Sequence, residues 1–366
     1  MNEGASTKST RLAYLDGLRG IAALAVVFYH YLATVQPLMV SPLGKMIVGI
    51  METPLLRLMT NGRYAVFIFF VLSGFVLSRS AAKGNVTLPA RLVTRYLRLT
   101  LPVWISIIFA WLLLHLFPTS RLQWEAISPN SWMKKYAFGK SVPGFADTLR
   151  EGLYRTYLSG DSLYNHALWT MRVELIGSVG IYVLYRFCPS RYVWAALGVF
   201  VAATRGISPY LGFPIGAFLY EIWKRDWFLE RNWGWGIFIV SLCLSMVAAD
   251  LADVHNVALY SIAAGLLILS ILKLPPLQRL LSAGFPQFLG RISFALYLVH
   301  LPLIVSVIAW LYFQLAGPLL LKLPLLLVVL LILSMFSAWV ITIGIDEPLV
   351  KQLHRLKKLR WPGISS

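Results

Sequence analysis

The sequence contains little cysteine and little negative charge. Of its 366 residues two are cysteines and 15 are Asp or Glu, against 33 Lys or Arg. Cys188 and Cys243 lie within or beside apolar segments, so the chain offers neither a disulfide framework nor the Cys/His spacing of a metal site. It also lacks a phosphate-binding glycine loop and the Gly-x-Ser-x-Gly elbow of serine hydrolases. We therefore predict no bound metal and no hydrolase domain of that type.

Charged residues are scarce overall. They make up 13% of the chain, whereas hydrophobic residues make up 58% and the mean hydropathy is +0.71. A soluble protein of this length cannot bury so much apolar surface, because too much of its chain lies at the surface. The sequence therefore predicts an integral membrane protein. Its formal charge of +18 then indicates basic loops facing anionic lipid, and no nucleic-acid partner.

About ten apolar runs approach the length that crosses a bilayer. They predict an all-α transmembrane bundle of about ten helices, forming a single domain over residues 1–366. The fifth and sixth runs are short and could form one broken hairpin. We expect the first run to be retained as a helix, because it is longer than the apolar core of a signal peptide. The runs lie at 15–36, 64–80, 98–117, 168–187, 191–204, 209–223, 234–250, 256–273, 292–314 and 319–345.

The distribution of Lys and Arg predicts that both termini are cytoplasmic. With the N-terminus inside, most basic residues fall on the inner side, including those at 79–98 and 351–360. The long loop at 118–165 argues against this topology, because it carries basic residues on the supposed outer side. We expect part of this loop to lie in the membrane interface as an amphipathic segment. Its basic and aromatic residues include Arg121, Lys134, Lys135, Lys140, Arg150, Arg155, Trp124, Trp132, Phe138 and Phe145.

The first apolar run carries ionisable groups at membrane depth. Arg19 and His30 are eleven residues apart, which on an α-helix is about 1100° of rotation and a rise of about 16 Å. They therefore share one helix face, and Asp16 lies one turn before Arg19, where the two can pair. Such groups usually face a protein interior or a water-filled cavity, which makes this helix a candidate site. The alternative is a structural Asp–Arg pair and a hydrogen-bonded, buried histidine.

A stripe of arginines begins the third run. Arg91, Arg95 and Arg98 fall at i, i+4 and i+7, on one side of a helix that enters the membrane from the cytoplasm. The stripe can be a topological anchor, or it can be a site for phosphates, which arginine binds with paired hydrogen bonds.

Three further positions are candidates. Ser73, beside Gly74, can hydrogen-bond across helices or to its own helix, so packing alone can explain it. Glu174 lies just inside an apolar run, and Arg172 points to a different helix face, so the carboxylate needs a partner from elsewhere. His300 is a similar but weaker case.

Several motifs, in order, resemble those of the acyltransferase family 3 membrane proteins. Residues 14–23 with Arg19 and His30 are similar to the start of that family, in which an Arg or Lys, ten residues and a His form a functional motif. Two departures are that residues 99–102 replace the family's Tyr-Pro, and Thr170-Met171 replaces Ser-Leu after Trp169. The other matching segments are 69–75, 95–99, 168–174, 293–300 and 347–348.

This resemblance implies an enzyme that moves an acyl group, usually acetyl, from cytoplasmic acyl-CoA to a hydroxyl of an extracytoplasmic glycan or lipid-linked saccharide. The expected location is the cell inner (cytoplasmic) membrane. The expected partners are the acyl-CoA, the acceptor and membrane lipids, with no nucleic acid and no metal.

The resemblance also implies roles for individual residues. His30 is expected to act as general base or to carry the acyl group briefly, and Glu174 to orient its imidazole. Arg19 is expected to polarise the thioester carbonyl or to guide CoA, with Asp16 fixing its orientation. Alternatively, Glu174 pairs structurally with a basic group such as Arg172 of a neighbouring turn or an arginine of another helix. The expected donor-binding residues are Arg91, Arg95, Arg98 and Ser73, and the expected substrate-binding residues are Trp169, Asn165, Tyr297 and His300.

A transporter or flippase is the alternative from another class of protein. Asp16, Arg19, His30 and Glu174 could form its intramembrane relay. The absence of a repeat in the sequence counts against it, as does the arginine stripe, which a relay does not need. A catalytically silent scaffold would not explain so many ionisable residues at membrane depth.

Overall fold

A computed structural model of the protein describes residues 12–84, 86–128, 142–189, 192–203, 209–225, 233–251 and 256–358. Within these ranges all regular structure is helical, which confirms the predicted fold class. The helices are α1 (Ala13–Val35), α2 (Pro42–Met51), α3 (Pro54–Met59), α4 (Gly62–Ala81), α5 (Leu88–Leu116), α6 (Ser120–Ile127), α7 (Phe145–Arg150), α8 (Thr156–Ser159), α9 (Trp169–Phe187), α10 (Val193–Ala203), α11 (Gly212–Lys224), α12 (Trp233–Asp250), α13 (Asn256–Lys273), α14 (Pro275–Leu281), α15 (Gly284–Leu303), α16 (Ala309–Gln314), α17 (Leu319–Ile341) and α18 (Glu347–Lys358). Shorter helical turns include η1 (Gln36–Leu38), η3 (Glu151–Arg155), η4 (His166–Leu168), η6 (Pro209–Leu211), η7 (Ile304–Ile308) and η8 (Thr342–Asp346).

Eight helical segments of the described chain are long and apolar enough to cross a membrane. The two short runs expected at 191–204 and 209–223 form α10 and α11, of 11 and 13 residues, which are shorter than a usual membrane-spanning helix. The eight segments are Ala13–Leu38, Gly62–Ala81, Leu88–Leu116, His166–Phe187, Trp233–Asp250, Asn256–Lys273, Gly284–Gln314 and Leu319–Leu353.

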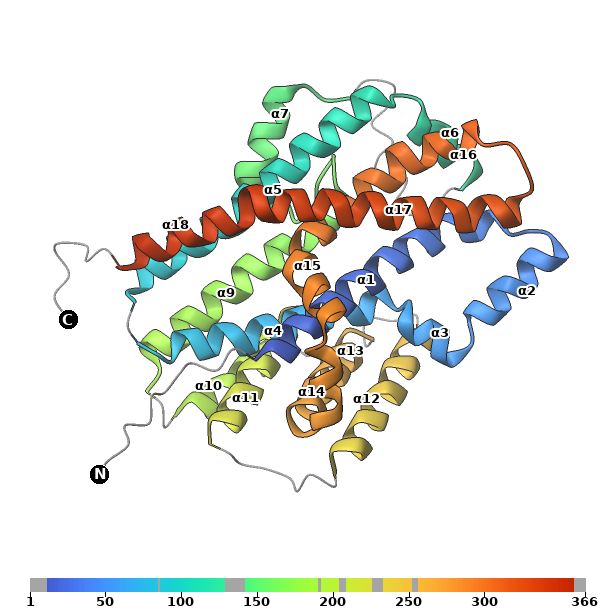
Figure 1. The fold of residues 1–366 in the computed structure, drawn as a ribbon. Coiled ribbons are helices and arrows are strands. Elements are labelled where there is room, and N and C mark those ends of the chain that lie inside the picture. The colour runs from blue at the N-terminus through green and yellow to red at the C-terminus, as the bar shows by residue number, and fades with distance from the viewer. Residues whose placement is uncertain are drawn as a thin grey trace.

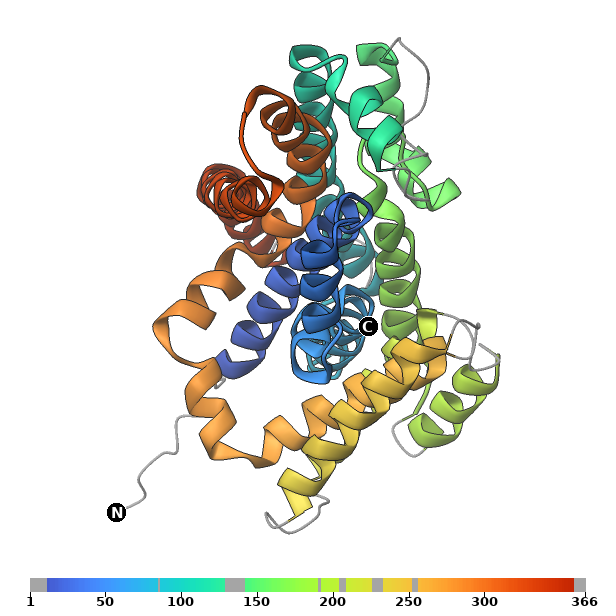
Figure 2. The same ribbon diagram turned by 90° about the vertical axis from the view of Figure 1, so that its right-hand side faces the viewer.

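Helix α15 lies at the centre of the bundle. It packs against α1, α5 and α17, and 89% of the most apolar stretch of its span is buried, against 22% for that of α17. Figure 2 shows the blue α1 running through the middle of the molecule, between the red α17 and the green α9. The inner helices α1, α4 and α15 are therefore those on which a buried site can be built.

Two glycines bring α1 and α15 into backbone contact. A side-chain carbon added at Gly20 would lie 2.3 Å from the amide nitrogen of Gly290, and one added at Gly290 would lie 2.3 Å from the carbonyl oxygen of Asp16. Only glycine permits so close an approach, since any Cβ would overlap the facing backbone. This contact fixes the height of α1 relative to α15.

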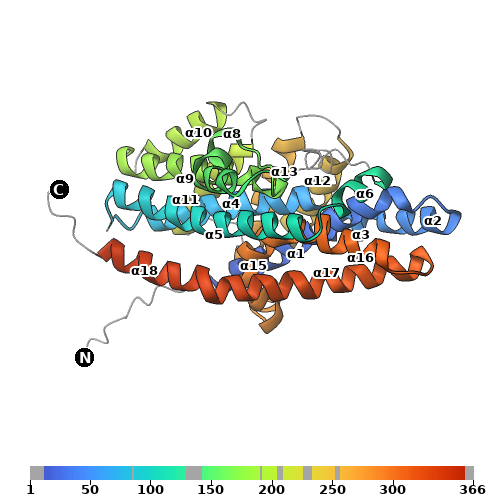
Figure 3. The ribbon, with the colours of Figure 1, turned by 90° about the horizontal axis from the view of Figure 1, so that it is seen from above.

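The bundle is elongated along the direction of α17. In Figure 1, α18 lies at the left end of the molecule, and α2 and α3 lie towards the right. The view from above in Figure 3 shows α17 and α18 as one long rod along an edge, with α18 again at the end opposite α2. The side of the membrane that each end faces stays a prediction.

The segment at 118–165 is partly helical and partly buried. Arg121 and Trp124 of α6 are each 1% exposed, and the Trp124 ring meets that of Tyr312 edge to face at 4.7 Å. The expectation of an interfacial position therefore does not apply to these two residues. Residues 129–141 of the loop expected at the membrane interface lie outside the described residues. The interfacial placement of the rest of this loop stays a prediction.

Candidate active site

A pair of histidines from α1 and α15 forms the centre of the candidate site. The Nε2 atom of His300 lies 3.1 Å from Nδ1 of His30, and the two ring centroids are 5.0 Å apart. His300 is fully buried, whereas His30 is half-buried. The sequence singled out both residues but could not show that they touch, because they are 270 positions apart.

The contacts of the two rings select one arrangement of protons. Nδ1 of His30 lies 3.0 Å from the carbonyl oxygen of Val26, and Nδ1 of His300 lies 3.3 Å from that of Leu296. A carbonyl oxygen only accepts, so both Nδ1 atoms carry hydrogen in the neutral rings. The single Nδ1 hydrogen of His30 is then shared between the carbonyl oxygen of Val26 and Nε2 of His300, and the basic lone pair of His30 is at Nε2.

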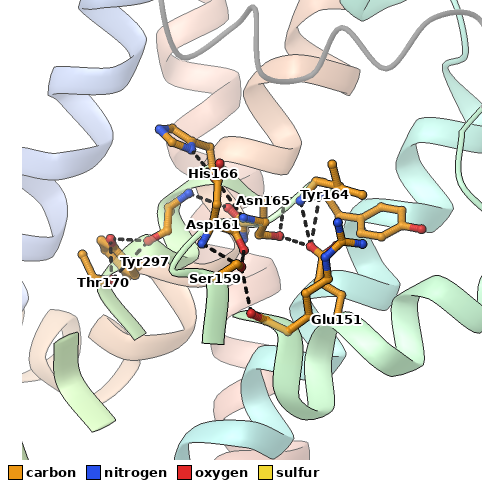
Figure 4. Close-up of polar contacts among 12 residues, drawn as sticks. Glu151, Ser159, Asp161, Tyr164, Asn165, His166, Thr170 and Tyr297 are labelled. Atoms are coloured by element: carbon orange, nitrogen blue, oxygen red, sulfur yellow. Dashed lines mark hydrogen bonds and ion pairs between the residues drawn. The ribbon is translucent and has the colours of Figure 1, made fainter. Parts of the chain in front are cut away.

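A third histidine, to which the sequence assigned no role, lies near this pair. Nδ1 of His166 is 3.2 Å from a carboxylate oxygen of Asp161, and His166 is close enough to His30 for their charges to interact. Figure 4 shows His166 and Asp161 joined across the loop that precedes α9. An Asp five residues before a His, in a stretch between helices, was the signal available in the sequence.

Asn165 and Tyr297 position this loop. Asn165 is fully buried, and its side-chain nitrogen donates to the hydroxyl of Ser106 at 3.2 Å and to the carbonyl of Leu298 at 2.6 Å. The Tyr297 hydroxyl donates to the carbonyl of Ala167 at 2.7 Å and lies 3.0 Å from the Thr170 hydroxyl. Figure 4 shows Tyr297 and Thr170 side by side. The hydrogen bonds of both residues thus hold the start of α9 against α15. Their expected role in substrate binding stays a prediction.

Trp169, the remaining predicted substrate residue, is half-buried at the start of α9. Its ring meets that of Phe70 edge to face, with centroids 6.3 Å apart. This contact joins α9 to α4.

Glu174 pairs with an arginine rather than with His30. One oxygen of its carboxylate accepts hydrogen bonds from the Arg95 guanidinium and from the Ser73 hydroxyl. Arg95 also donates from Nε to the Ser178 hydroxyl at 2.9 Å. The side chains of Arg95 and Glu174 are 14% and 13% exposed, so the pair is mostly withdrawn from solvent. The alternative of an ion pair with an arginine of another helix is thus observed, no direct contact of Glu174 with His30 is seen, and a role of Glu174 in catalysis stays a prediction.

The structure separates the three arginines of the predicted stripe. Arg91 is buried, with Nε 3.0 Å from the carbonyl oxygen of Val86 and Nη1 2.9 Å from that of Ser80, so it holds the connection between α4 and α5. Its expected contact with the donor stays a prediction. Arg98 is exposed and makes no hydrogen bond or ion pair with any described residue.

The surroundings of Arg98 include other charged groups. Arg19, Arg95 and Asp346 lie close enough to act on its charge. Arg19 itself is 3.4 Å from the carboxylate of Asp16, which confirms the predicted one-turn pairing. Arg19, Arg95 and Arg98 therefore gather cationic groups from α1 and α5 in one region.

Glu151, below the His166 loop, is a buried carboxyl outside the spans. Burial raises the pKa of Glu151 above its ordinary value of 4.5, and hydrogen bonds from Ser162 and the backbone of Leu163 partly oppose the shift. A raised pKa in the folded state means that the folded protein binds the proton more tightly. The stability that this group contributes is thus complete below the ordinary pKa and is lost as pH rises through the folded pKa.

Among the described residues no group of three His, Cys, Asp or Glu side chains could hold a metal ion.

The chain matches the sequence profile of acyltransferase family 3, an acyltransferase domain, over residues 12–343, and it belongs to this family. An O-acetyltransferase, PaAT-1 of Phomopsis amygdali, is 26% identical over 368 aligned positions, which cover 80% of this chain and 72% of that protein. No solved structure matches the chain. The protein is thus a multi-pass membrane O-acyltransferase, and the transporter considered from the sequence is set aside.

Proposed function

We propose that the protein transfers an acetyl or other acyl group from acyl-CoA, bound at the arginine end of the bundle, to a hydroxyl of a saccharide-like acceptor. The observation that carries this proposal is the His30–His300 pair, in which the basic lone pair of His30 is at Nε2. We further propose that the protein resides in the cell inner membrane, with acyl-CoA arriving from the cytoplasm.

His30 would act as general base in this reaction. Its Nε2 takes the proton of the acceptor hydroxyl while the hydroxyl oxygen attacks the thioester carbonyl carbon. The carbon–sulfur bond then breaks, and the protonated His30 returns the proton to the CoA sulfur. Alternatively, Nε2 itself attacks the thioester carbonyl carbon, the carbon–sulfur bond breaks and the CoA thiolate leaves; the hydroxyl oxygen then takes the acyl group from Nε2, and its proton goes to the CoA thiolate.

His300 supports either route through its contact with Nδ1 of His30. By accepting that hydrogen, it holds the imidazole in one tautomer and one orientation. The dyad of His166 and Asp161 lies within electrostatic range and is suited to a second proton-transfer step.

Arg98 is the residue best placed to hold the CoA phosphates. It is exposed and makes no hydrogen bond or ion pair with described residues, whereas Arg95 is engaged by Glu174. Guanidinium groups bind phosphate oxygens with paired hydrogen bonds. Arg19, paired with Asp16 on the same helix as His30, would act on the thioester carbonyl between the phosphates and the base.

The test uses purified protein in lipid nanodiscs with acetyl-CoA and a panel of saccharides. Free CoA and the O-acetylated saccharide should form together, and neither should form with His30→Ala. His115→Ala is the matched control, because His115 likewise lies 2.9 Å from a backbone carbonyl of its own helix but at the exposed end of α5. Release of CoA that is equal in the presence and absence of every acceptor, or full activity of His30→Ala, would contradict the proposal.

A further inference from the structure

A cavity of about 300 Å³ lies at the end of the bundle formed by the C-terminus of α1 and the N-terminus of α4. Residues of α2, α3, α12 and α13 complete its walls. Its volume is at the lower end of the range that is usual for small-molecule sites in proteins. Arg19, Arg95 and Arg98, the cationic residues near the proposed donor, do not line it.

One wall of the cavity is fixed by an internal ion pair. Arg57 of α3 donates from Nη1 to Asp250 at 2.5 Å and from Nη2 to the carbonyl of Ala249 at 3.1 Å, and its Nε lies 3.6 Å from Glu52. These bonds join α3 to the end of α12. The charge of Arg57 is therefore used within the protein, and the wall that it builds is preformed.

Two other polar side chains of the cavity have no such partner. Gln36 and Arg63 are exposed, and the side chain of neither makes a hydrogen bond or ion pair with a described residue. Tyr29 and Tyr260 add aromatic rings to the same cavity. Aromatic faces together with an amide and a guanidinium are the groups that suit a hydroxylated ring bearing an anionic substituent.

The cavity is connected to His30 through Tyr29, and it lies towards the end of α1 opposite Arg19. The ring of Tyr29 lines it and also meets the His30 ring edge to face, with centroids 5.2 Å apart. Along α1, Arg19 lies eleven residues before His30, and Gln36 lies six residues after it. A donor held by Arg19 and Arg98 and a molecule held in the cavity would therefore approach His30 from opposite ends of α1.

We propose that this cavity is the acceptor site and that it takes a hydroxylated, sugar-like ring whose anionic group pairs with Arg63. The assignment of the cavity as an acceptor site rests on the proposed function, but the binding of a sugar to the cavity can be measured without any acyl donor. Arg63 then selects an acidic acceptor over its neutral counterpart.

The test compares methyl β-D-glucuronide with methyl β-D-glucoside, a pair that differs in one carboxylate. Calorimetric titration of the protein in nanodiscs, without any acyl donor, should give about tenfold tighter binding of the glucuronide, as expected for one charge-assisted contact. Arg63→Ala should abolish this preference, and Lys45→Ala, which removes an exposed cation of α2 outside the cavity, should keep it. Val48→Trp, which fills the cavity from α2, should weaken binding of both sugars.

The possible failures are distinguishable. Equal or undetectable binding of the two sugars, a preference that survives Arg63→Ala, or unchanged affinity in Val48→Trp would overturn the site while leaving acyl transfer intact. Binding as expected, with no acetyl transfer to the bound sugar, would instead remove the role of the cavity as an acceptor site, whereas the proposed function itself fails only if no saccharide of the panel is acetylated.

Discussion

The ion pair between Glu174 and Arg95 supports a quantitative prediction about Glu174→Gln. The amide oxygen of Gln can still accept from Ser73, but the charge that holds Arg95 is lost. A hydrogen bond to a charged group contributes about 1.5–3 kcal/mol. The larger cost of breaking a fully buried ion pair does not apply, because both side chains keep 13–14% exposure. The melting temperature of Glu174→Gln should therefore fall by about 3–12 °C.

A thermal double-mutant cycle is the assay. Glu174→Gln, Arg95→Met and the double variant are melted in the same nanodiscs, and the shift of the double variant should be smaller than the sum of the single shifts. Glu347→Gln is the matched control, because it removes the carboxylate of another Arg–Glu pair, with Arg291, in which both side chains are more exposed. Its melting temperature should change less.

Activity measured on the same preparations separates structure from catalysis. The folded fraction of Glu174→Gln should retain turnover within about tenfold of the unmodified protein, because the carboxylate does not touch His30. An unchanged melting temperature combined with a loss of turnover by orders of magnitude would refute this reasoning. It would restore the direct catalytic role that the sequence suggested.

Four further outcomes are expected. His30→Ala should lower turnover by about 10²- to 10⁴-fold with an unchanged melting temperature, and full turnover would exclude it as the base. His300→Ala should lower kcat by about tenfold or more without changing KM for acyl-CoA, and His300→Gln, whose amide oxygen can accept, should restore part of the loss. Arg98→Ala should raise KM for acyl-CoA about 10- to 100-fold, whereas Arg91→Ala should lower thermal stability instead. Glu151→Gln should reduce the loss of melting temperature as pH rises from 4.5, and an unchanged pH profile would contradict the shift.

The helices were predictable because lipid imposes a length and a composition that can be read locally. The apolar runs coincide with α1, α4, α5, α9, α12, α13, α15 and α17. The position of α10 and α11 was also found, but their shortness left their relation to the membrane open. Burial of part of the loop at 118–165 could not be predicted, because the partner of Trp124, Tyr312, is 188 positions away.

The sequence singled out most residues of the candidate site, although not His166, and it predicted the local pairing of Asp16 with Arg19 but not the pairings between helices. The periodicity of Arg91, Arg95 and Arg98 placed them on one side of a helix, yet their partners differ. Arg91 lies in the first turn of α5, where it reaches back to the connection from α4, whereas Arg95 faces α9. Periodicity describes one helix, and a pairing depends on which other helix packs against each part of it.

The pairing of His30 with His300 follows from a spacing that occurs twice. Gly20 precedes His30 by ten residues, and Gly290 precedes His300 by ten residues. Once these glycines place α1 and α15 in backbone contact, each helix rises by about 15 Å to its histidine, so the two imidazoles arrive at one height if the helices run parallel. Their observed contact shows that they do. A side chain at Gly290 would therefore act on catalysis from about 15 Å away, by displacing one imidazole along the other.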